Sequence, residues 1–394
     1  MKDRRTPPVL PYGRQCITED DIAAVIAVLR SEFITQGPAI ARFEQSVAEY
    51  CGAKHAIAVS SATAALHIGA LALGLGPRDR LWTSPNTFVA SANCALYCGA
   101  QVDFVDIDAR SYNMSITSLG KKLESAKAAG TLPKVLVPVH FAGQSCEMQP
   151  IADLCKRYGV RVMEDASHAV GATYQEQAVG NCRYSDLAVF SFHPVKIITT
   201  GEGGMLLTND SELHDRLVRL RSHGTVRNER VMSEPGAGPW SYAQVDLGFN
   251  YRMTDLQAAL GESQMHRLPA FLERRRALVA RYNELLAPLP LILPWQHPDT
   301  NSSWHLYVVR PDPSRTRVDR LRLYQGLRER QIHAQVHYIP VHTQPWYRDL
   351  GFKSGDFPVA EHYYSGALSL PLYPDLGEEG QDRVVAALQA LFAA

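Results

Sequence analysis

Lys196 lies in the stretch SFHPVKIITTGEGG, between an apolar, β-prone run and a cluster of glycines. A lysine beside glycines is typical of a phosphate-binding loop, but that loop has the order GxxxxGK[ST], with its glycines before the lysine. Here Ile197 follows Lys196, and Gly201, Gly203 and Gly204 come later. The order excludes a phosphate loop and leaves two interpretations of Lys196, a reactive amine or a solvated surface side chain.

Other side chains that could do chemistry follow predicted strands at the point where each strand ends. Open α/β sheets bind ligands beyond the carboxyl ends of their strands, so we expect these side chains to gather at one edge. They are Ala62 and Thr63 after strand 55–60, Phe88 after strand 80–85, Asp165 and His168 after strand 160–165, and Ser191 and Lys196 at and after strand 187–193. Together they supply an anion-binding helix N-terminus, a carboxylate, an imidazole, an aromatic ring and an amine.

Pyridoxal phosphate needs this combination of groups. Its phosphate needs amides and hydroxyls, its aldehyde needs a lysine for a Schiff base, and its ring nitrogen needs a carboxylate that keeps it protonated. The sequence therefore predicts a pyridoxal phosphate site with Lys196 and Asp165 in these roles. A nicotinamide dinucleotide fits poorly, because the first strand-to-helix turn, SSATAAL, has no GxGxxG fingerprint.

The elements that must position these residues form a repeating pattern. Short apolar runs alternate with stretches of helical periodicity, which predicts a mostly parallel sheet with helices on both faces. The predicted strands are 55–60, 80–85, 101–107, 134–140, 160–165, 187–193 and 204–210. Long helices are expected at 211–222 and 254–282, and Pro269 should kink or divide the second.

The composition changes near residue 290, where PLPLILPWQHPD is rich in proline. The remaining chain combines apolar runs at 304–310 and 333–339 with a helix near 318–330 and a terminal helix. We therefore expect a large α/β domain over residues 1–285, with its N-terminal segment, and a smaller α+β domain over residues 286–394.

The bulk composition restricts the partners. Forty basic residues balance forty acidic ones, which argues against electrostatically driven binding to nucleic acid or to a membrane surface. The seven cysteines are scattered without a CxxC pair, so free thiols are expected rather than disulfides or zinc ligands. The sequence shows neither a signal peptide nor a membrane span, and we expect a soluble, cytoplasmic protein without a metal.

Longer motifs resemble the sugar aminotransferases of the DegT/DnrJ/EryC1/StrS family and occur in the family's order along nearly the whole chain. They are ITQGP (34–38), SSATAAL (60–66), TFVASANC (87–94), EDASHA (164–169), SFHPVK…GEGG (191–204), RSHG (221–224) and NYRMTDLQAALG (250–261). The resemblance implies the α/β fold of type I pyridoxal-phosphate-dependent transferases, like aspartate aminotransferase. It also implies a homodimer whose active site is shared across the interface.

The resemblance assigns a role to each matching residue. Lys196 matches the Schiff-base lysine that also moves the substrate proton, Asp165 the partner of the pyridine nitrogen, and His168 a position near the cofactor's 3-hydroxyl. Phe88 matches the ring-stacking aromatic. The cofactor phosphate is expected to contact the backbone amide of Ala62, the side chains of Thr63 and Ser191, and Asn250 of the other subunit. The residues that match substrate contacts are Tyr12, Ile34, Thr35, Arg252, His337 and Tyr338. Structural roles compete with these, such as a turn-forming Asp165, a core Phe88 or a solvated Arg252.

Within the family, HPVKIITTGEGG and LSLPLYP (368–374) resemble the subgroup that makes the 4-amino precursor of pseudaminic acid. This resemblance implies UDP-2-acetamido-2,6-dideoxy-β-L-arabino-hexos-4-ulose as acceptor and L-glutamate as amino donor. Two alternatives remain open: the same chemistry on another UDP- or dTDP-linked 4-keto sugar, and a non-catalytic sugar-nucleotide-binding protein with this fold.

Overall fold

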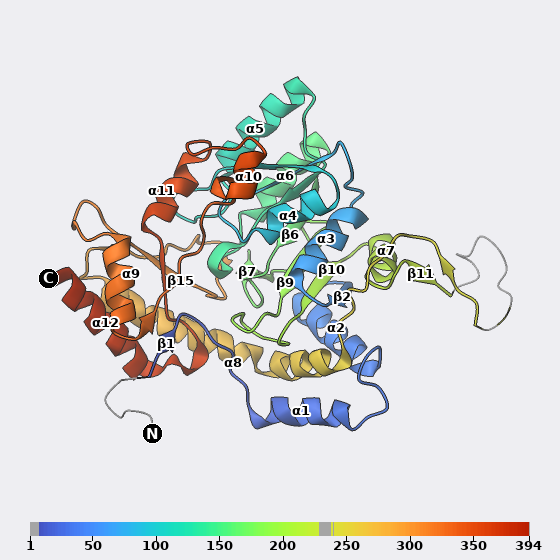
Figure 1. The fold of residues 1–394 in the computed structure, drawn as a ribbon, viewed down its shortest axis with the longest axis horizontal. Coiled ribbons are helices and arrows are strands. Elements are labelled where there is room, and N and C mark those ends of the chain that lie inside the picture. The colour runs from blue at the N-terminus through green and yellow to red at the C-terminus, as the bar shows by residue number, and fades with distance from the viewer. Residues whose placement is uncertain (1–7, 228–237, 239, 394) are drawn as a thin grey trace.

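A seven-stranded sheet forms the centre of the computed structural model, which describes residues 8–227, 238 and 240–393 (Figure 1). Neighbouring strands are parallel except at β10, which is antiparallel to both β2 and β9. In spatial order the strands are β2 (His55–Val59), β10 (Gly204–Thr208), β9 (Leu187–Ser191), β6 (Arg161–Asp165), β5 (Val135–Val137), β3 (Arg80–Thr83) and β4 (Gln101–Phe104). Each lies within a predicted run, so the predicted α/β sheet is confirmed.

Both faces of the sheet are buried, which explains why its strands are apolar at consecutive positions rather than at alternate ones. In β2, Ile57 and Val59 belong to one core cluster, whereas Ala56 and Ala58 belong to another on the opposite face. The helices that follow the sheet strands are α3 (Ala62–Ala72), α4 (Ala90–Tyr97), α5 (Ile116–Ala129), α6 (Met148–Tyr158) and α7 (Ser211–Arg221).

One long helix, α8 (Asp255–Leu286), runs across the lower part of the molecule in Figure 1, above α1. Of the two effects expected of Pro269, a kink or a division, the division is wrong, because the helix continues through this residue, and the kink stays a prediction. Proline removes one backbone donor, but the neighbouring Leu268, Phe271 and Leu272 are buried in the core and hold the helical turn in place.

The start of α8 also organises the N-terminal helices, α1 (Glu19–Leu29) and α2 (Pro38–Cys51). The Asp255 carboxylate accepts hydrogen bonds from the amides of Gly37, at 2.9 Å, and Ala39, at 3.2 Å, and so caps α2. Asp21 of α1 is buried and bonds to Arg267 and Gln264 of α8. These contacts bring the ITQGP and NYRMTD motifs together.

The C-terminal part contains a three-stranded antiparallel sheet in the order β13 (Leu291–Ile292), β15 (Tyr307–Pro311), β17 (Leu368–Leu370). Its helices are α9 (Arg320–Glu329), α10 (Pro345–Asp349), α11 (Pro358–Gly366) and α12 (Gly377–Ala393). A short strand, β1 (Leu10–Pro11), pairs in parallel with β16 (Ile332–His333) and ties the N-terminal segment to this part. The division into two domains at residue 285 stays a prediction.

The apolar run 333–339 forms less strand than its composition predicts. Regular pairing ends at His333, and beyond it Gln335 makes a single bridge to Ser369. The available neighbour, β17, has only three residues, and the chain turns away at Pro340. The segment therefore runs on irregularly and places His337 and Tyr338 in a cavity.

The remaining strands form small accessory sheets. They are β7 (Thr173–Tyr174), β8 (Gln177–Ala178) and β14 (Thr300–Asn301) in one, and β11 (Thr225–Val226) and β12 (Ala243–Gln244) in a hairpin that projects from the body of the molecule (Figure 1). In the described ranges, we find no helix whose length and apolar character together would let it span a membrane.

Gly204 lies where three parts of the chain meet, since it pairs with Val59 on one side and Ser191 on the other. A Cβ at this position would lie 2.5 Å from the backbone nitrogen of Ala62. We expect Gly204→Ala to lower the free energy of unfolding by about 1–3 kcal/mol, because the backbone has to shift to relieve this overlap. Urea unfolding of both proteins measures the difference.

A matched control is Gly120→Ala in α5, where a Cβ meets no atom within 4 Å. There alanine should raise stability by about 0.5–1 kcal/mol through its helix propensity. Equal unfolding midpoints for the two alanine variants would contradict the close approach at Gly204.

Candidate active site

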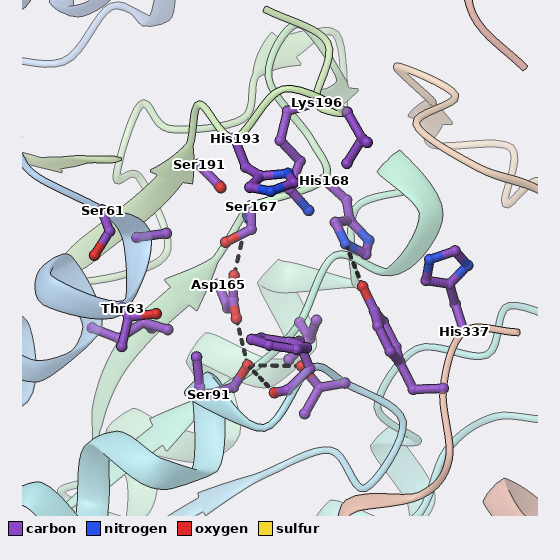
Figure 2. Close-up of a pocket in the computed structure, with 18 of the residues that line it drawn as sticks. Ser61, Thr63, Ser91, Asp165, Ser167, His168, Ser191, His193, Lys196 and His337 are labelled. Atoms are coloured by element: carbon purple, nitrogen blue, oxygen red, sulfur yellow. Dashed lines mark hydrogen bonds between the residues drawn. The ribbon is translucent and has the colours of Figure 1, made fainter. Parts of the chain in front are cut away.

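A cavity of about 450 Å³ opens at the carboxyl ends of β2, β3, β6 and β9 (Figure 2). Ten of the residues that the sequence places at the site line it. They are Tyr12, Ala62, Thr63, Phe88, Asp165, His168, Ser191, Lys196, His337 and Tyr338. Segments that are far apart in the sequence therefore meet at one edge of the sheet, as expected from its topology.

The N-terminus of α3 forms one wall of the cavity. Ser61 is the residue before the helix, and its hydroxyl accepts a hydrogen bond from the amide of Ala64 at 3.1 Å. The first amides of a helix have no acceptor within the helix, and here they adjoin the hydroxyls of Thr63 and Ser191. Such a combination of amides and hydroxyls suits a phosphate group.

Asp165 ends β6 and is held rigidly from two sides. One carboxylate oxygen accepts a hydrogen bond from the Ser91 hydroxyl at 2.5 Å, and the other accepts one from the amide of Ser167 at 3.1 Å. Thr87 extends this network, with its hydroxyl 2.7 Å from that of Ser91. The side chain is buried yet faces the cavity, so its negative charge is available to a cationic ring nitrogen.

Phe88 lies between β3 and α4 and leaves 58% of its surface exposed, although it lines a cavity. A core phenylalanine would be covered on all sides. The exposed ring instead offers a flat apolar surface to a ligand, with the ring of Tyr338 at 6.3 Å between centroids. This environment agrees with a stacking role and not with a core role.

Lys196 lies on an irregular loop that buried side chains hold in place. Phe192, Ile197 and Ile198 are buried in the core on either side of it. The amide of Phe192 donates to Gly203 O at 3.0 Å, and the Lys196 amide closes a turn onto His193 O at 2.9 Å. The lysine backbone is thereby fixed while its amine reaches into the cavity (Figure 2).

The surroundings of Lys196 lower the pKa of its amine to about 8. Burial is the main cause, because it penalises the charged form, and the Asp165 carboxylate acts in the opposite direction. An amine with this pKa is neutral in a substantial fraction of molecules near neutral pH, as a nucleophile or a proton acceptor requires. Lys196 is thus a perturbed amine and not a solvated surface side chain.

Three buried histidines lie near Lys196: His168, His305 and His337. Burial lowers their pKa values, and the positive charge of Lys196 adds to the effect, bringing that of His337 to about 3. They are therefore neutral at physiological pH. His168 lies where sequence places it, with its ring 4.4 Å from that of His305.

Six polar residues of the cavity wall received no role from the sequence: Ser61, Thr87, Ser91, Ser167, His193 and Glu202. Ser91 follows Phe88 by three residues, which puts both on one side of a helical turn, and that spacing could have revealed it. His193 and Glu202 lie within the SFHPVK…GEGG motif itself.

Four residues that the sequence assigns to the site do not line this cavity: Ile34, Thr35, Asn250 and Arg252. They belong to neighbouring segments, since Thr35 bridges to Thr254 and Arg252 bridges to Val59 at the end of β2. The Ile34 side chain is 52% exposed. Their assigned roles stay predictions.

The cavity meets the requirements of pyridoxal phosphate. It offers amides and hydroxyls for a phosphate, a fixed carboxylate for the ring nitrogen, an exposed aromatic face and an amine with a lowered pKa. Among the described residues, no group of three or more His, Cys, Asp or Glu side chains is arranged to hold a metal ion.

Comparison with known proteins gives matches along nearly the whole chain. The DegT/DnrJ/EryC1/StrS aminotransferase family model matches residues 15–389. Spore coat polysaccharide biosynthesis protein SpsC of Bacillus subtilis (strain 168) is 40% identical over 385 residues, which is 96% of each chain. Helicobacter pylori PseC, an aminotransferase involved in the biosynthesis of pseudoaminic acid, is 32% identical, with a TM-score of 0.87 over 98% of this chain and 99% of that one.

A further solved structure bears on the cofactor. Spr1654 from Streptococcus pneumoniae, solved in a PLP form and a PMP form, is 27% identical in the PLP form, with a TM-score of 0.87 over 98% of this chain and 99% of that one.

The lowered pKa of Lys196 predicts how the apoprotein takes up pyridoxal phosphate. Only the neutral amine attacks an aldehyde, so the rate of covalent attachment should rise about tenfold per pH unit below pH 8 and then level off. Stopped-flow absorbance measures this rate. Lys196→Ala is the control and should show no covalent attachment at any pH; a rate that still rises steeply above pH 9 would contradict the lowered pKa.

Proposed function

The chain belongs to the DegT/DnrJ/EryC1/StrS aminotransferase family and is a pyridoxal-phosphate-dependent sugar aminotransferase, and we propose that it aminates a UDP-linked 4-keto-6-deoxy sugar. The proposed acceptor is UDP-2-acetamido-2,6-dideoxy-β-L-arabino-hexos-4-ulose, and the product is the 4-amino sugar that leads to pseudaminic acid. L-glutamate as the donor and a cytoplasmic location belong to the same proposal.

One observation carries the choice of sugar: PseC, which acts in pseudoaminic acid biosynthesis, resembles this chain in fold over 98% of its length at 32% identity. The subgroup motifs HPVKIITTGEGG and LSLPLYP support the same choice.

The bound cofactor acts as an electron sink for the substrate carbon that loses or gains a proton. The residues of this chain prepare the site for that step. Asp165, fixed by Ser91 and the Ser167 amide, holds the proton on the ring nitrogen. Lys196 moves the proton to and from the substrate carbon, which its pKa of about 8 permits near neutral pH. Phe88, exposed in the cavity, would cover one face of the ring and shield it from water.

A second candidate substrate has its own support. SpsC, whose name places it in spore coat polysaccharide biosynthesis, is 40% identical to this chain, a higher value than that of PseC. The same residues would then aminate a different nucleotide-linked keto sugar, because sugar choice rests on few contacts. Both candidates share the chemistry and differ only in the acceptor.

The acceptor is tested by incubating the holoenzyme and L-glutamate with a panel of UDP- and dTDP-linked 4-keto sugars and identifying each aminated product by mass spectrometry. We expect kcat/KM for the proposed UDP sugar to exceed that for the others by at least about 10-fold, the discrimination of roughly one well-placed contact. A dTDP sugar that outcompetes it would refute the sugar assignment and leave the aminotransferase intact. Absence of amination with every sugar would favour a non-catalytic binding protein.

The proposal includes a homodimer in which each subunit completes its partner's site. Asn250, Arg252, Ile34 and Thr35 lie in adjoining segments outside the cavity of their own chain. Tyr242, Val245 and Leu247 lie on either side of β12, a few residues before Asn250 in the sequence, with 64%, 41% and 81% of their surface accessible. Large apolar side chains exposed together are typical of protein interfaces.

Mixed dimers test the shared site. Lys196→Ala and Asn250→Ala should each abolish most activity alone, whereas refolding them together in equal amounts should recover about a quarter of the wild-type activity. Random pairing makes half of the dimers mixed, and each mixed dimer has one intact site. The measurement is transamination rate against mixing ratio. No recovery despite a dimeric mass, or an active Asn250→Ala protein, would refute the role of Asn250.

A further inference from the structure

The hydrogen bonds of His168 fix the position of its proton. Its Nδ1 lies 3.2 Å from the backbone nitrogen of Ala142, whose N–H can only donate. Nδ1 is therefore an acceptor, and the ring proton lies on Nε2. A second proton on Nδ1 would point at the Ala142 N–H, which disfavours the charged ring. Burial and the nearby charge of Lys196 disfavour it as well, and they lower the pKa of His168 well below its usual value.

The position of this proton decides the direction of the next hydrogen bond. The Nε2 atom lies 3.1 Å from the Tyr338 hydroxyl oxygen, so Nε2–H donates and the tyrosine oxygen accepts. The hydroxyl hydrogen of Tyr338 must then point elsewhere. In the described part of the chain His168 is the only hydrogen-bond partner of this hydroxyl, and Tyr338 lines the cavity.

Tyr338 keeps this hydrogen at any physiological pH. Burial raises the pKa of its hydroxyl, and the neighbouring Tyr12 and Asp165 raise it further. The other ionisable groups that face it, His168 and His337, are neutral. Tyr338 is thus a permanent donor whose hydrogen is directed away from His168 and is free for a ligand.

The position of His168 in the cavity indicates which ligand atom receives the hydrogen. Ser61 and Thr63 lie on one side of the cavity and His168 on the other, with Asp165 and Lys196 between them (Figure 2). In pyridoxal phosphate the ring oxygen lies on the opposite side of the aldehyde carbon from the phosphate arm. A cofactor with its phosphate at α3 and its ring nitrogen at Asp165 would have that oxygen on the side of His168 and Tyr338.

We propose that Tyr338 is the hydrogen-bond donor to the cofactor's ring oxygen, and that His168 is a positioning residue that acts through Tyr338 and not on the cofactor directly. The inference rests on the cofactor site described above. It reassigns the contact with the 3-hydroxyl, which the family resemblance gives to His168, to a residue of the C-terminal part.

The surroundings of His168 hold its ring in the orientation that this role needs. Ala142 has a left-handed backbone, with φ 59°, which turns its N–H toward the ring. The Ser303 hydroxyl donates to His168 O at 2.9 Å. Arg275, fully buried in α8, donates to Trp304 O at 3.0 Å and so anchors the segment that carries His305 against the His168 ring.

The test is the pH dependence of the visible absorption of the holoenzyme, measured without substrate. A donor to the ring oxygen stabilises its negative charge, so its loss should raise the pH midpoint of the spectral change. We expect Tyr338→Phe to raise this midpoint by about one unit. His168→Leu should raise it by less, and the double variant should give the same midpoint as Tyr338→Phe, because His168 acts through the tyrosine.

Control variants separate this role from a general disturbance of the site. Tyr12→Phe removes a hydroxyl from the same cavity, from a ring that lies 5.1 Å from His337, and should leave the midpoint unchanged. His168→Gln keeps an N–H donor and should stay close to the wild-type value.

Two outcomes would overturn the inference: an unchanged midpoint in Tyr338→Phe, or a further rise when His168→Leu is added to it. A wild-type protein without a visible band after incubation with pyridoxal phosphate would instead refute the cofactor site itself. The two failures are therefore distinguishable.

Discussion

The structure depends on the insertion of one antiparallel strand, β10, between β2 and β9. Its first residue, Gly204, pairs with both Val59 and Ser191 and touches the backbone at the start of α3. The strands β2 and β9, whose ends supply the phosphate-binding groups, are therefore separated by one strand, and their register relative to each other is fixed. The parallel neighbour β6 then brings Asp165 level with this edge, because Asp165 pairs with Val189 in β9. The groups that follow β2, β6 and β9 take their positions from this arrangement.

The same burial that orders the site also controls its charges. Removing water favours the neutral form of each base, so His168, His305 and His337 carry no charge, and the pKa of Lys196 falls to about 8. Asp165 remains available as a fixed carboxylate because Ser91 and the Ser167 amide donate to it. The cavity therefore places a firmly held carboxylate beside an amine that can exchange a proton, with neutral imidazoles around them.

The sequence predicts the parts of the site that depend on strand ends and fails where the backbone is irregular. All seven sheet strands, and with them Asp165, Ser191 and Thr63, follow from short apolar runs whose ends meet at one edge. Composition does not reveal that Pro269 is tolerated inside α8, since buried neighbours compensate for its missing donor. Nor does it reveal the direction of the His168 hydrogen bond, which depends on a left-handed residue at Ala142 in a distant segment. The roles of Ile34, Thr35, Asn250 and Arg252 remain predictions, because a single chain does not bring them into its cavity.

The two halves of the cavity differ in how freely they can change. The cofactor half is built from strand ends that also carry the core, so substitutions there disturb the sheet. The other half includes Tyr12 and His337, which are joined by local contacts: β1 pairs with β16 just before them, and the Tyr12 and His337 rings lie 5.1 Å apart. Tyr12 and His337 lie outside the central sheet, so their side chains can change while Tyr338 and the groups at the strand ends stay in place. Substrate choice can therefore diverge among proteins that share the same sheet and the same lysine. For this reason the sequence of this chain indicates its chemistry more directly than it indicates which sugar it aminates.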